Sequence, residues 1–287
     1  MAHRTKGIGV SLELSYIIPV SNGGRPDFAV RCRNLQFIYD SFIMKQKEVQ
    51  FEVIFVEQTV SRQFPHYAKN IRIDKDNTRF IHISWPVFNK GWCINVGARA
   101  AQAPVIVVAE ADCFSIDGMY FFSILNNFLS GEHKWAFGWD ALQYLSQYES
   151  MQIMRGDQIA PRGRRYRPYS GGPEGGILVY NRGWYLKIGG HNEFVQGLGG
   201  PDNEMADRAK WWSKSYTKLN ADILHLWHPQ VKGSYRRDGH RVYNKQIIKL
   251  QRNYMANIAP RIAKTTIGDP NKPACGKKTY VQMRSGK

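Results

Sequence analysis

The chain has 287 residues, of which 43% are hydrophobic and 13% aromatic, so a packed core is expected and global disorder is excluded. Its formal net charge is +17, and no apolar run approaches the roughly 20 residues that cross a bilayer. The N-terminal stretch MAHRTKGIGVSLELSYIIPV lacks a small-residue cleavage site, which favours a first strand over a signal peptide. Cys32, Cys93, Cys113 and Cys275 form no C-x-x-C pair, which favours reduced thiols in a cytosolic protein.

The first half of the chain alternates between strand and helix patterns. We expect strands at 15–20, 51–58, 79–85 and 104–112, and helices at 28–42 and 91–101. This alternation predicts a single α/β domain with a mixed, mainly parallel sheet flanked by helices. Ligands of such sheets bind at the carboxyl ends of the strands, where Glu57, Glu110 and Asp112 fall.

The second half is less regular. We expect an aromatic strand at 134–139, an arginine-rich loop at 155–167, a glycine-led strand within 170–180, helices at 183–187 and 203–213, and a strand at 221–227. After Pro229, apolar residues spaced among lysines and arginines predict one more helix, with a loosely structured tail from about Ile258. The expected organisation is a catalytic domain over 1–230 and a basic C-terminal helix and tail over 231–287.

The positive charge is concentrated in two segments. Residues 228–287 hold 14 lysines and arginines against two aspartates, and 155–167 hold five arginines against one aspartate, which leaves the rest nearly neutral. Such segments predict a polyanionic partner, which could be nucleic acid, an anionic membrane surface or an acidic glycan. The alternative is a charge that serves solubility alone.

Two groups of residues could hold a metal. Glu110 and Asp112 directly follow the apolar run VIVV, and carboxylates at a strand end can bind a divalent cation that holds a diphosphate. His225 and His228, in HLWHP, follow another strand. Carboxylate together with imidazole suits Mn²⁺ better than Mg²⁺. The alternatives are a solvated strand end and structural histidines.

The segment FNKGWCINVGARAA places Lys90 at a helix start, with Asn95 between two glycines. Lys90 and the backbone amides there could meet a phosphate. The chain has neither the GxGxxG of dinucleotide-binding folds nor the GxxxxGK[ST] of P-loops.

In this order, SYIIPV, FEVIFVEQ, FNKGWCINVGARAA, VIVVAEAD, GGILVYNRGWYLKIGGHNEFVQGLGGPDNEMADR and HLWHP resemble the GT-A glycosyltransferases. The resemblance is to the galactosyltransferase-like branch, with the β-1,4-galactosyltransferases and the related bacterial and phage family-2 enzymes. It spans roughly residues 15–230, and 175–208 are its most specific part. It implies a GT-A (Rossmann-like) fold and transfer of a sugar from a UDP-sugar with inversion, with Mn²⁺ or Mg²⁺ as cofactor.

The resemblance also implies roles for individual residues. The metal ligands are Asp112, as the last acid of the D-x-D motif, His228, and His225 as a possible second imidazole. Glu110 stands where the family has the first acid of that motif. The implied contacts to the nucleotide sugar are Pro19, Val20, Arg25, Glu57, Lys90, Asn95, Glu110 and Gly176.

The turn GLGGPDNEMADR implies the catalytic base. The galactosyltransferases carry GG followed by acids here, and the second acid is their base. This chain has Pro201 in place of the first of these acids, which binds the acceptor, and Asp202 in place of the base. An Asp behind glycines at a helix start suits a base close to substrate, although it could serve as a plain N-cap. The acceptor is therefore expected to differ from that of the galactosyltransferases.

Three interpretations of the function remain open. In the preferred one, the acceptor is DNA with a hydroxymethylated pyrimidine, as in phage genome modification, in a bacterial or phage-infected cytosol. Phosphates would contact Arg162, Arg164, Arg165 and Arg167, and a base taken out of the helix would stack on aromatics such as Trp139. The second is a cell-envelope glycan or lipopolysaccharide at the inner membrane, where peripheral contact with anionic lipid is possible. The third is a non-catalytic nucleic-acid-binding module on a degenerate transferase fold.

Overall fold

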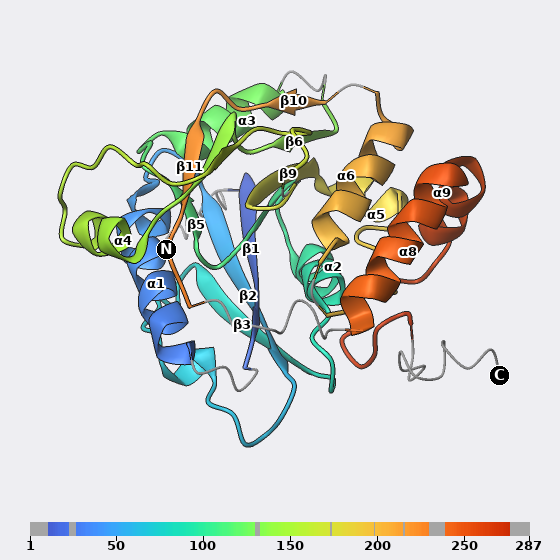
Figure 1. The fold of residues 1–287 in the computed structure, drawn as a ribbon, viewed down its shortest axis with the longest axis horizontal. Helices are drawn as coiled ribbons and strands as arrows, with labels where there is room; N and C mark the ends of the chain where they lie inside the picture. Colours follow the sequence, from blue (N-terminus) through green and yellow to red (C-terminus); the bar gives the residue numbers. More distant parts are fainter. Residues whose placement is uncertain are drawn as a thin grey trace, which may run out of the picture.

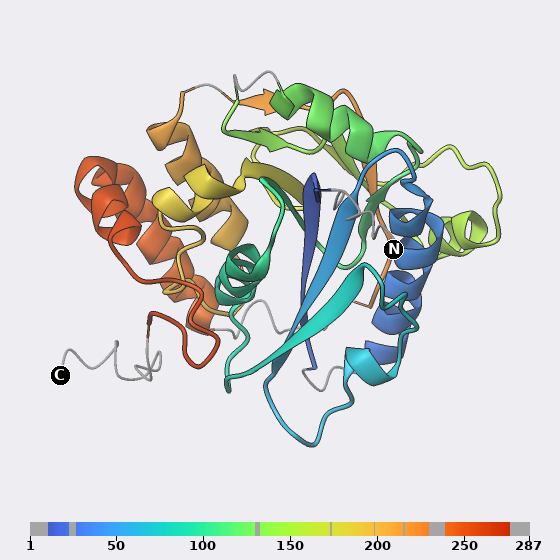
Figure 2. The same cartoon turned by 180° about the vertical axis from the view of Figure 1, so that it is seen from behind.

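The computed structural model describes residues 11–22, 27–129, 133–172, 174–197, 199–214, 216–229 and 239–275. Within these residues, two sheets lie between groups of helices (Figure 1). The views from both sides place α1 and α4 at one side of the molecule and α5, α6, α8 and α9 at the other (Figures 1 and 2). This arrangement confirms the predicted α/β class.

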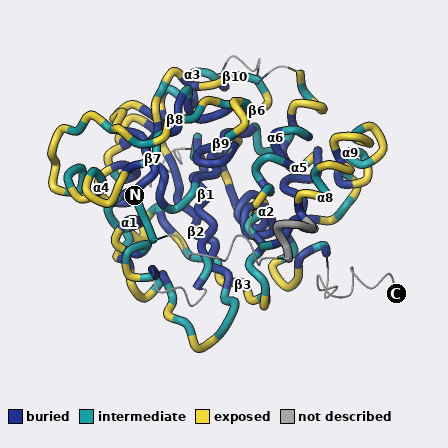
Figure 3. The backbone as a smooth tube through the Cα atoms, viewed as in Figure 1, coloured by how far each residue is buried: buried dark blue, intermediate teal, exposed yellow. Residues whose placement is uncertain are grey.

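The main sheet has seven strands in the order β10-β6-β9-β4-β1-β2-β3. Their bounds are β1 Leu14–Ser21, β2 Phe51–Thr59, β3 Thr78–Ser84, β4 Val105–Ala109, β6 Trp135–Phe137, β9 Ile177–Asn181 and β10 Thr217–Lys218. Strand β1 pairs in parallel with β2 and β4, and β9 runs antiparallel to β4 and β6. The sheet is therefore mixed and mainly parallel, as the alternating pattern predicts. Its central strands are near-continuous apolar runs because helices cover both faces (Figure 3).

A second sheet has four short strands in the order β5-β11-β7-β8. Their bounds are β5 Cys113–Ser115, β7 Ala141–Tyr144, β8 Arg165–Tyr166 and β11 Asp222–His225. Because only three residues separate β4 from β5, and β5 pairs with β11, the end of β4 lies close to His225. This pairing brings together two segments that are far apart in the chain.

The helices are α1 Phe28–Ser41, α2 Lys90–Ala100, α3 Tyr120–Leu129, α4 Gln147–Met154, α5 Arg182–Lys187, α6 Pro201–Trp212, α8 Gly239–Asn253 and α9 Met255–Ala263, with short 3₁₀ turns at Ile43–Lys45 and Tyr67–Lys69. The side chain of Asn89 accepts from the amide of Trp92 and so caps α2. Gly97 lets α2 approach the sheet, since a Cβ there would lie 2.5 Å from Ile17 Cγ2. Cap and close packing together fix Lys90 at the edge of the sheet.

The prediction of a loosely structured tail after Ile258 is wrong for the described part of that segment. Helix α9 continues to Ala263, and the chain beyond it packs on the main body. The indole of Trp92 donates to the carbonyl of Asp269 at 2.7 Å, and the buried Glu193 carboxylate accepts from the amides of Gly268 and Ala274. The sequence pattern could not show this because the bonds join side chains of the body to tail backbone.

The expected boundary at 230/231 lies in a segment outside the described residues. Beyond it, the Asn244 amide on α8 donates to the carbonyls of Gln196 and Gly199. Helix α8 therefore packs against the turn before α6, and both α8 and α9 contact α6 (Figure 1). No helix among the described residues has the length and apolar character needed to cross a membrane.

Candidate active site

Lys90, at the first turn of α2, joins two acids that the sequence places 92 residues apart. Its Nζ lies 2.6 Å from Glu110 Oε1 and 2.8 Å from Asp202 Oδ2. Glu110 follows β4, and Asp202 lies in the first turn of α6. The side chains of Lys90 and Asp202 are each 14% exposed, so the three groups form a largely buried charged cluster with access to solvent.

This cluster sets the charge states of its members. Burial opposes the charged form of Lys90, but the carboxylates of Asp202 and Glu110 outweigh it and raise the Lys90 pKa. Burial likewise opposes ionisation of Asp202, but the Lys90 ammonium holds the Asp202 pKa well below its usual range. Asp202 is therefore ionised at neutral pH, the state that a general base requires.

Asp202 does not cap α6. The N-cap is Gly200, whose φ of +99° favours glycine, and Pro201 occupies the first helical position. The Asp202 side chain points instead to Lys90, whereas Glu204 forms a buried ion pair with Arg208 at 2.8 Å. Asp202 therefore directs its charged side chain into the site and does not serve as the helix cap.

Glycines let the two acids approach. A Cβ on Gly175 would lie 2.9 Å from both Asp202 Oδ2 and Glu110 Oε1. The next residue, Gly176, accepts from the amide of Glu110 through its carbonyl at 2.8 Å. The predicted site residue Gly176 therefore lies beside the acids, and Gly175 is a position that the sequence interpretation missed.

The predicted metal ligands lie close together. Asp112 Oδ1 lies 3.5 Å from His225 Nε2, and Asp112 Oδ2 lies 3.3 Å from His228 Nε2. Burial raises the pKa of Asp112, but nearby His225 and Arg31 outweigh it and the carboxyl pKa is lowered; burial lowers the pKa of His228. An ionised carboxylate with two imidazole nitrogens directed at it is a donor set that fits Mn²⁺. Cys113 also lies near, but burial keeps its thiol pKa high.

Arg31 also belongs to this group, although no motif in the sequence marks it. Its Nη1 lies 3.4 Å from Asp112 Oδ2, its Nη2 lies 3.0 Å from His228 Nδ1, and its Nε donates to Asp27 at 2.7 Å. The guanidinium supplies positive charge beside Asp112. A cation bound to Asp112 and His228 would therefore have Arg31 at its edge.

The residues implied to contact the nucleotide differ in their surroundings. Pro19 and Val20 are buried in β1, with Val20 in register with Glu57 of β2. The fully buried Glu57 carboxylate accepts from the amide of Tyr67 at 2.6 Å, with His66 and His82 nearby. This strand-end group could itself hold a metal ion. Arg25 lies outside the described residues.

Asn95 and Trp139, two of the predicted contact residues, have buried side chains that form hydrogen bonds within the fold. Asn95 donates to the His191 carbonyl and to Glu193 Oε1, each at 2.8 Å. Trp139 donates from its indole to the Gly175 carbonyl at 3.0 Å. Both side chains are 0% exposed. Asn95 therefore holds other residues of the site in place, and Trp139 offers no open face on which a base could stack.

The predicted arginine loop is exposed at all four named positions. Arg165 pairs with Asp222 at 2.7 Å, and Arg167 pairs with Asp140 at 3.1 Å. The side chains of Arg162 and Arg164 have no ion pair with the described residues. Two of the four guanidinium groups are thus left for an anionic partner.

A cavity of about 510 Å³ lies between the turn before α6 and helix α8. Its lining includes Gly199, Gly200 and Asn203 on one side, and the basic residues Lys245, Lys249 and Arg252 on the other, with no acidic residue. Asn203 follows Asp202 in the first turn of α6, so the cavity lies beside the helix start that carries the candidate base. The prediction of a basic helix anticipated the charge of α8 but not where it faces.

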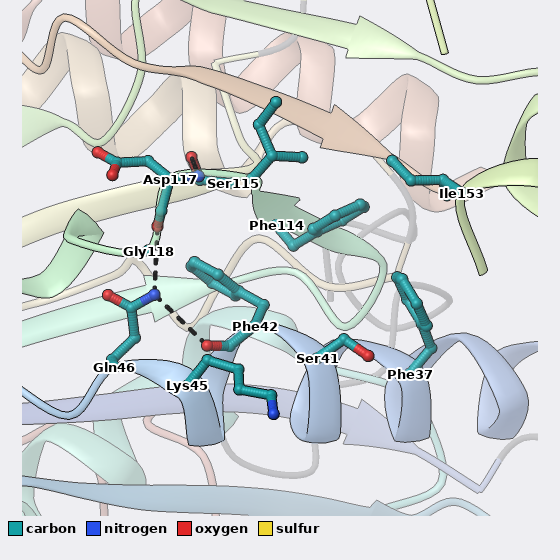
Figure 4. A pocket seen from close by; sticks show the side chains of 11 residues that line it. Phe37, Ser41, Phe42, Lys45, Gln46, Phe114, Ser115, Asp117, Gly118 and Ile153 are labelled. Atoms are coloured by element: carbon teal, nitrogen blue, oxygen red, sulfur yellow. Dashed lines mark hydrogen bonds between the residues drawn. The ribbon is translucent and has the colours of Figure 1, made fainter. Parts of the chain in front are cut away.

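A smaller cavity of about 190 Å³ lies away from these residues, between α1 and β5 (Figure 4). Phe37, Phe42 and Phe114 line it, and the amide of Gln46 bonds to the carbonyls of Phe42 and Asp117. None of the acids or imidazoles described above faces it, so it is no part of the site.

No family model and no curated protein sequence matches the chain. Among solved structures, it is similar to the catalytic domain of Drosophila β1,4-galactosyltransferase 7 in complex with xylobiose, at 15% identity and a TM-score of 0.42, covering 79% of this chain and 73% of that chain. A mutant of the same Drosophila enzyme in complex with manganese, UDP-Gal and xylobiose is similar at 16% identity, with the same TM-score and coverage.

Proposed function

We propose that the protein is a metal-dependent inverting glycosyltransferase that moves a sugar from a UDP-sugar to a hydroxyl of a polyanionic acceptor. The observation that carries the proposal is the contact of Lys90 with both Glu110 and Asp202. This contact unites a cationic side chain suited to a diphosphate, a strand-end acid and an ionised candidate base. The sequence resemblance to the galactosyltransferase-like enzymes supports the same chemistry.

In the proposed reaction the acceptor oxygen attacks the anomeric carbon of the donor sugar. A new C–O bond forms on one face while the bond from that carbon to the diphosphate oxygen breaks on the other, which inverts the anomeric centre. UDP leaves with the electron pair, and the hydroxyl proton passes to Asp202. General-base assistance of this kind contributes about 10²–10⁴-fold to a rate.

Asp112, His225 and His228 would hold the divalent cation, and Mn²⁺ fits their mixed oxygen and nitrogen donors best. The cation would supply positive charge to the diphosphate leaving group. Arg31 contacts Asp112 and Lys90 contacts the nearby Glu110, and both add fixed cationic charge. Such preorganised charge favours departure of an anionic leaving group.

The basic cavity supports a polyanionic acceptor. Lys245 and Lys249 line it, are exposed, and have no ion pair with the described residues. Arg252 also lines it, with Asp207 bound to its Nε at 2.7 Å. Cationic side chains next to the first turn of α6 would hold phosphates of the acceptor while its hydroxyl meets Asp202.

DNA with a hydroxymethylated pyrimidine is our preferred acceptor. It offers a hydroxyl for transfer and phosphates on either side of it, which the cavity and the pair Arg162 and Arg164 would contact. A bacterial or phage-infected cytosol fits the four free, buried cysteines. The buried Trp139 removes the stacking surface first expected, so an extruded base would need other contacts.

The test combines labelled UDP-sugars and Mn²⁺ with two acceptors, hydroxymethylated DNA and a cell-envelope lipid extract. We expect UDP release with at least one donor and label in the DNA. Label in the lipid alone would replace DNA by an envelope acceptor. If the wild type neither hydrolyses nor transfers any donor, and Asp112→Ala behaves the same as the wild type, the enzymatic proposal is overturned in favour of a non-catalytic binding module.

A further inference from the structure

A buried histidine lies directly behind the candidate base. His191, in the turn between α5 and α6, is 0% exposed, and its Nε2 lies 3.8 Å from Asp202 Oδ1. Among the described residues this nitrogen has no hydrogen-bond partner. A buried polar atom left unpaired costs about 1–3 kcal/mol.

The network around His191 fixes which ring nitrogen carries the proton. Asn95 donates both amide protons, to the His191 carbonyl and to Glu193, so its Oδ1 is the atom that accepts from the His191 amide at 2.9 Å. The Tyr185 hydroxyl donates its single proton to the same Oδ1 at 2.6 Å. The phenol oxygen, 2.7 Å from His191 Nδ1, must therefore accept from Nδ1–H. In the neutral ring, the Nε2 lone pair faces Asp202.

The preceding glycine is part of this arrangement. Gly190 has a φ of +51°, and a Cβ there would lie 2.3 Å from Asn95 Oδ1. Any other residue would displace the amide that orders Tyr185. The absence of a side chain at Gly190 thus allows the hydrogen bonds among Asn95, Tyr185 and His191 to form.

The His191 ring is neutral because burial outweighs the carboxylates of Asp202 and Glu204, which favour its protonated form. Burial is the largest influence and lowers the His191 pKa. The titratable and charged groups that face it are Asp202, Glu204 and Arg208 of α6, Lys90 of α2, Tyr180 of β9, Tyr185 of α5, and Glu193 through Asn95. A neutral ring leaves two acceptors, Nε2 and Asp202 Oδ1, facing each other with no proton between them.

We propose that His191 is a positioning residue for Asp202, placed to bind the proton that the base takes from the acceptor. This inference rests on the proposed function. The acceptor O–H bond breaks, an Oδ1–H bond forms on Asp202, and that proton is held between Oδ1 and His191 Nε2 after an approach of about 1 Å to hydrogen-bond distance. Lys90 stabilises the ionised base, and the bare Nε2 of a neutral His191 would accept a hydrogen bond from Asp202 once the carboxyl is protonated.

The test compares kcat in two substitutions of His191. If the ring only fills space, His191→Phe should be the more active variant, whereas if Nε2 binds the proton, His191→Gln should be. His191→Phe keeps the ring shape and removes both nitrogens, whereas His191→Gln fits the shape less well but offers an amide oxygen near the place of Nε2. We expect kcat to fall roughly 10- to 100-fold in His191→Phe and less in His191→Gln, with the donor Kd within about twofold of wild type in both. Equal kcat in wild type and His191→Phe, or a lower kcat in His191→Gln than in His191→Phe, would overturn the inference.

A second pair of variants tests the proton position. Tyr185→Phe removes the hydroxyl that receives Nδ1–H, and Tyr180→Phe removes a neighbouring buried hydroxyl that has no hydrogen-bond partner among the described residues. We expect a loss of kcat in the first and little change in the second. Equal kcat in the two variants would overturn the inference.

Nitrogen-15 NMR of the wild-type imidazole needs neither activity nor a variant. At neutral pH we expect a protonated Nδ1 and a bare Nε2 on His191. A ring protonated at both nitrogens would overturn the inference while leaving the proposed function intact. A wild-type protein that transfers no sugar would overturn the proposed function and, with it, this inference.

Discussion

Lys90 Nζ lies 2.8 Å from Asp202 Oδ2 and 2.6 Å from Glu110 Oε1, so one ammonium joins the candidate base to the strand-end acid. The ion pair keeps Asp202 ionised but makes it a weak base. A diphosphate bound beside Glu110 would compete for the same ammonium. Any displacement of Lys90 toward it would leave Asp202 more basic, so donor binding and the strength of the base are coupled through Lys90.

Lys90→Met should therefore move the pH dependence of transfer. Asp202 must be ionised to act, and Lys90 holds its pKa below the ordinary value of 3.8. Removing an opposite charge at this distance raises a carboxyl pKa by roughly 1–3 units, so the acid limb of kcat/KM should move to higher pH by about that much. The pH–rate profile measures it, with the exposed Lys187→Met as control. An unchanged limb would contradict the ion pair's role.

Chelation should abolish transfer, and Mn²⁺ should restore it. Asp112→Ala removes the carboxylate that faces both imidazoles, so the Mn²⁺ concentration for half-maximal activity should rise about tenfold or more. Isothermal titration with Mn²⁺ checks the binding directly. Asp117→Ala, at an exposed acid beyond the site, should change neither value, and equal Mn²⁺ affinity in the two variants would exclude the proposed site.

Reversing the charge of the basic cavity should weaken acceptor binding selectively. The double variant Lys245→Glu, Lys249→Glu should bind hydroxymethylated DNA more weakly and with a smaller salt dependence, since each lost phosphate contact lowers the slope of log K against log salt by about 1. Binding measured at several salt concentrations tests this. The double variant Lys45→Glu, Lys75→Glu makes the same charge change at exposed positions outside the cavity. Equal slopes in the two would show that the acceptor binds elsewhere.

The tail should contribute to stability through Glu193. This buried carboxylate accepts from the Gly268 amide at 2.7 Å and from the Ala274 amide, so Glu193→Ala leaves buried donors unpaired. We expect a loss of about 1–3 kcal/mol in the free energy of unfolding per unsatisfied group, measured by denaturant titration. The exposed Glu48→Ala should change it by less than about 0.5 kcal/mol. Similar losses in both would mean that the tail does not dock in solution.

Local patterns predicted the strands and helices that place the site. Apolar runs marked β1, β2 and β4, and the alternation with helices implied that Glu110 and Asp112 lie at one sheet edge. The pattern carried β4 too far, to 112, whereas it ends at Ala109. Helices α3 and α4 went unpredicted. The short polar sequence of α4 shows no clear amphipathic period, whereas the period of α3 is present in YFFSILNNFL and was overlooked.

The tertiary partners of the site could not be read from the chain. Lys90, Asp202, Asp112 and His228 were all singled out, but no local pattern shows that Lys90 bonds to Asp202 rather than to a phosphate alone. Arg31 and His191 carry no motif of their own. Their importance comes from long-range contacts, 197 residues apart for Arg31 and His228, which only the folded arrangement reveals.

The central claim is that Asp202 takes the acceptor's proton during sugar transfer. The most direct test measures transfer and UDP-sugar binding side by side in Asp202→Asn, with Asp40→Asn on the exposed face of α1 as control. We predict that kcat falls by about 10²–10⁴-fold while the donor Kd stays close to that of wild type. Transfer at the wild-type rate in Asp202→Asn, or loss of donor binding in parallel with loss of transfer, would contradict the account.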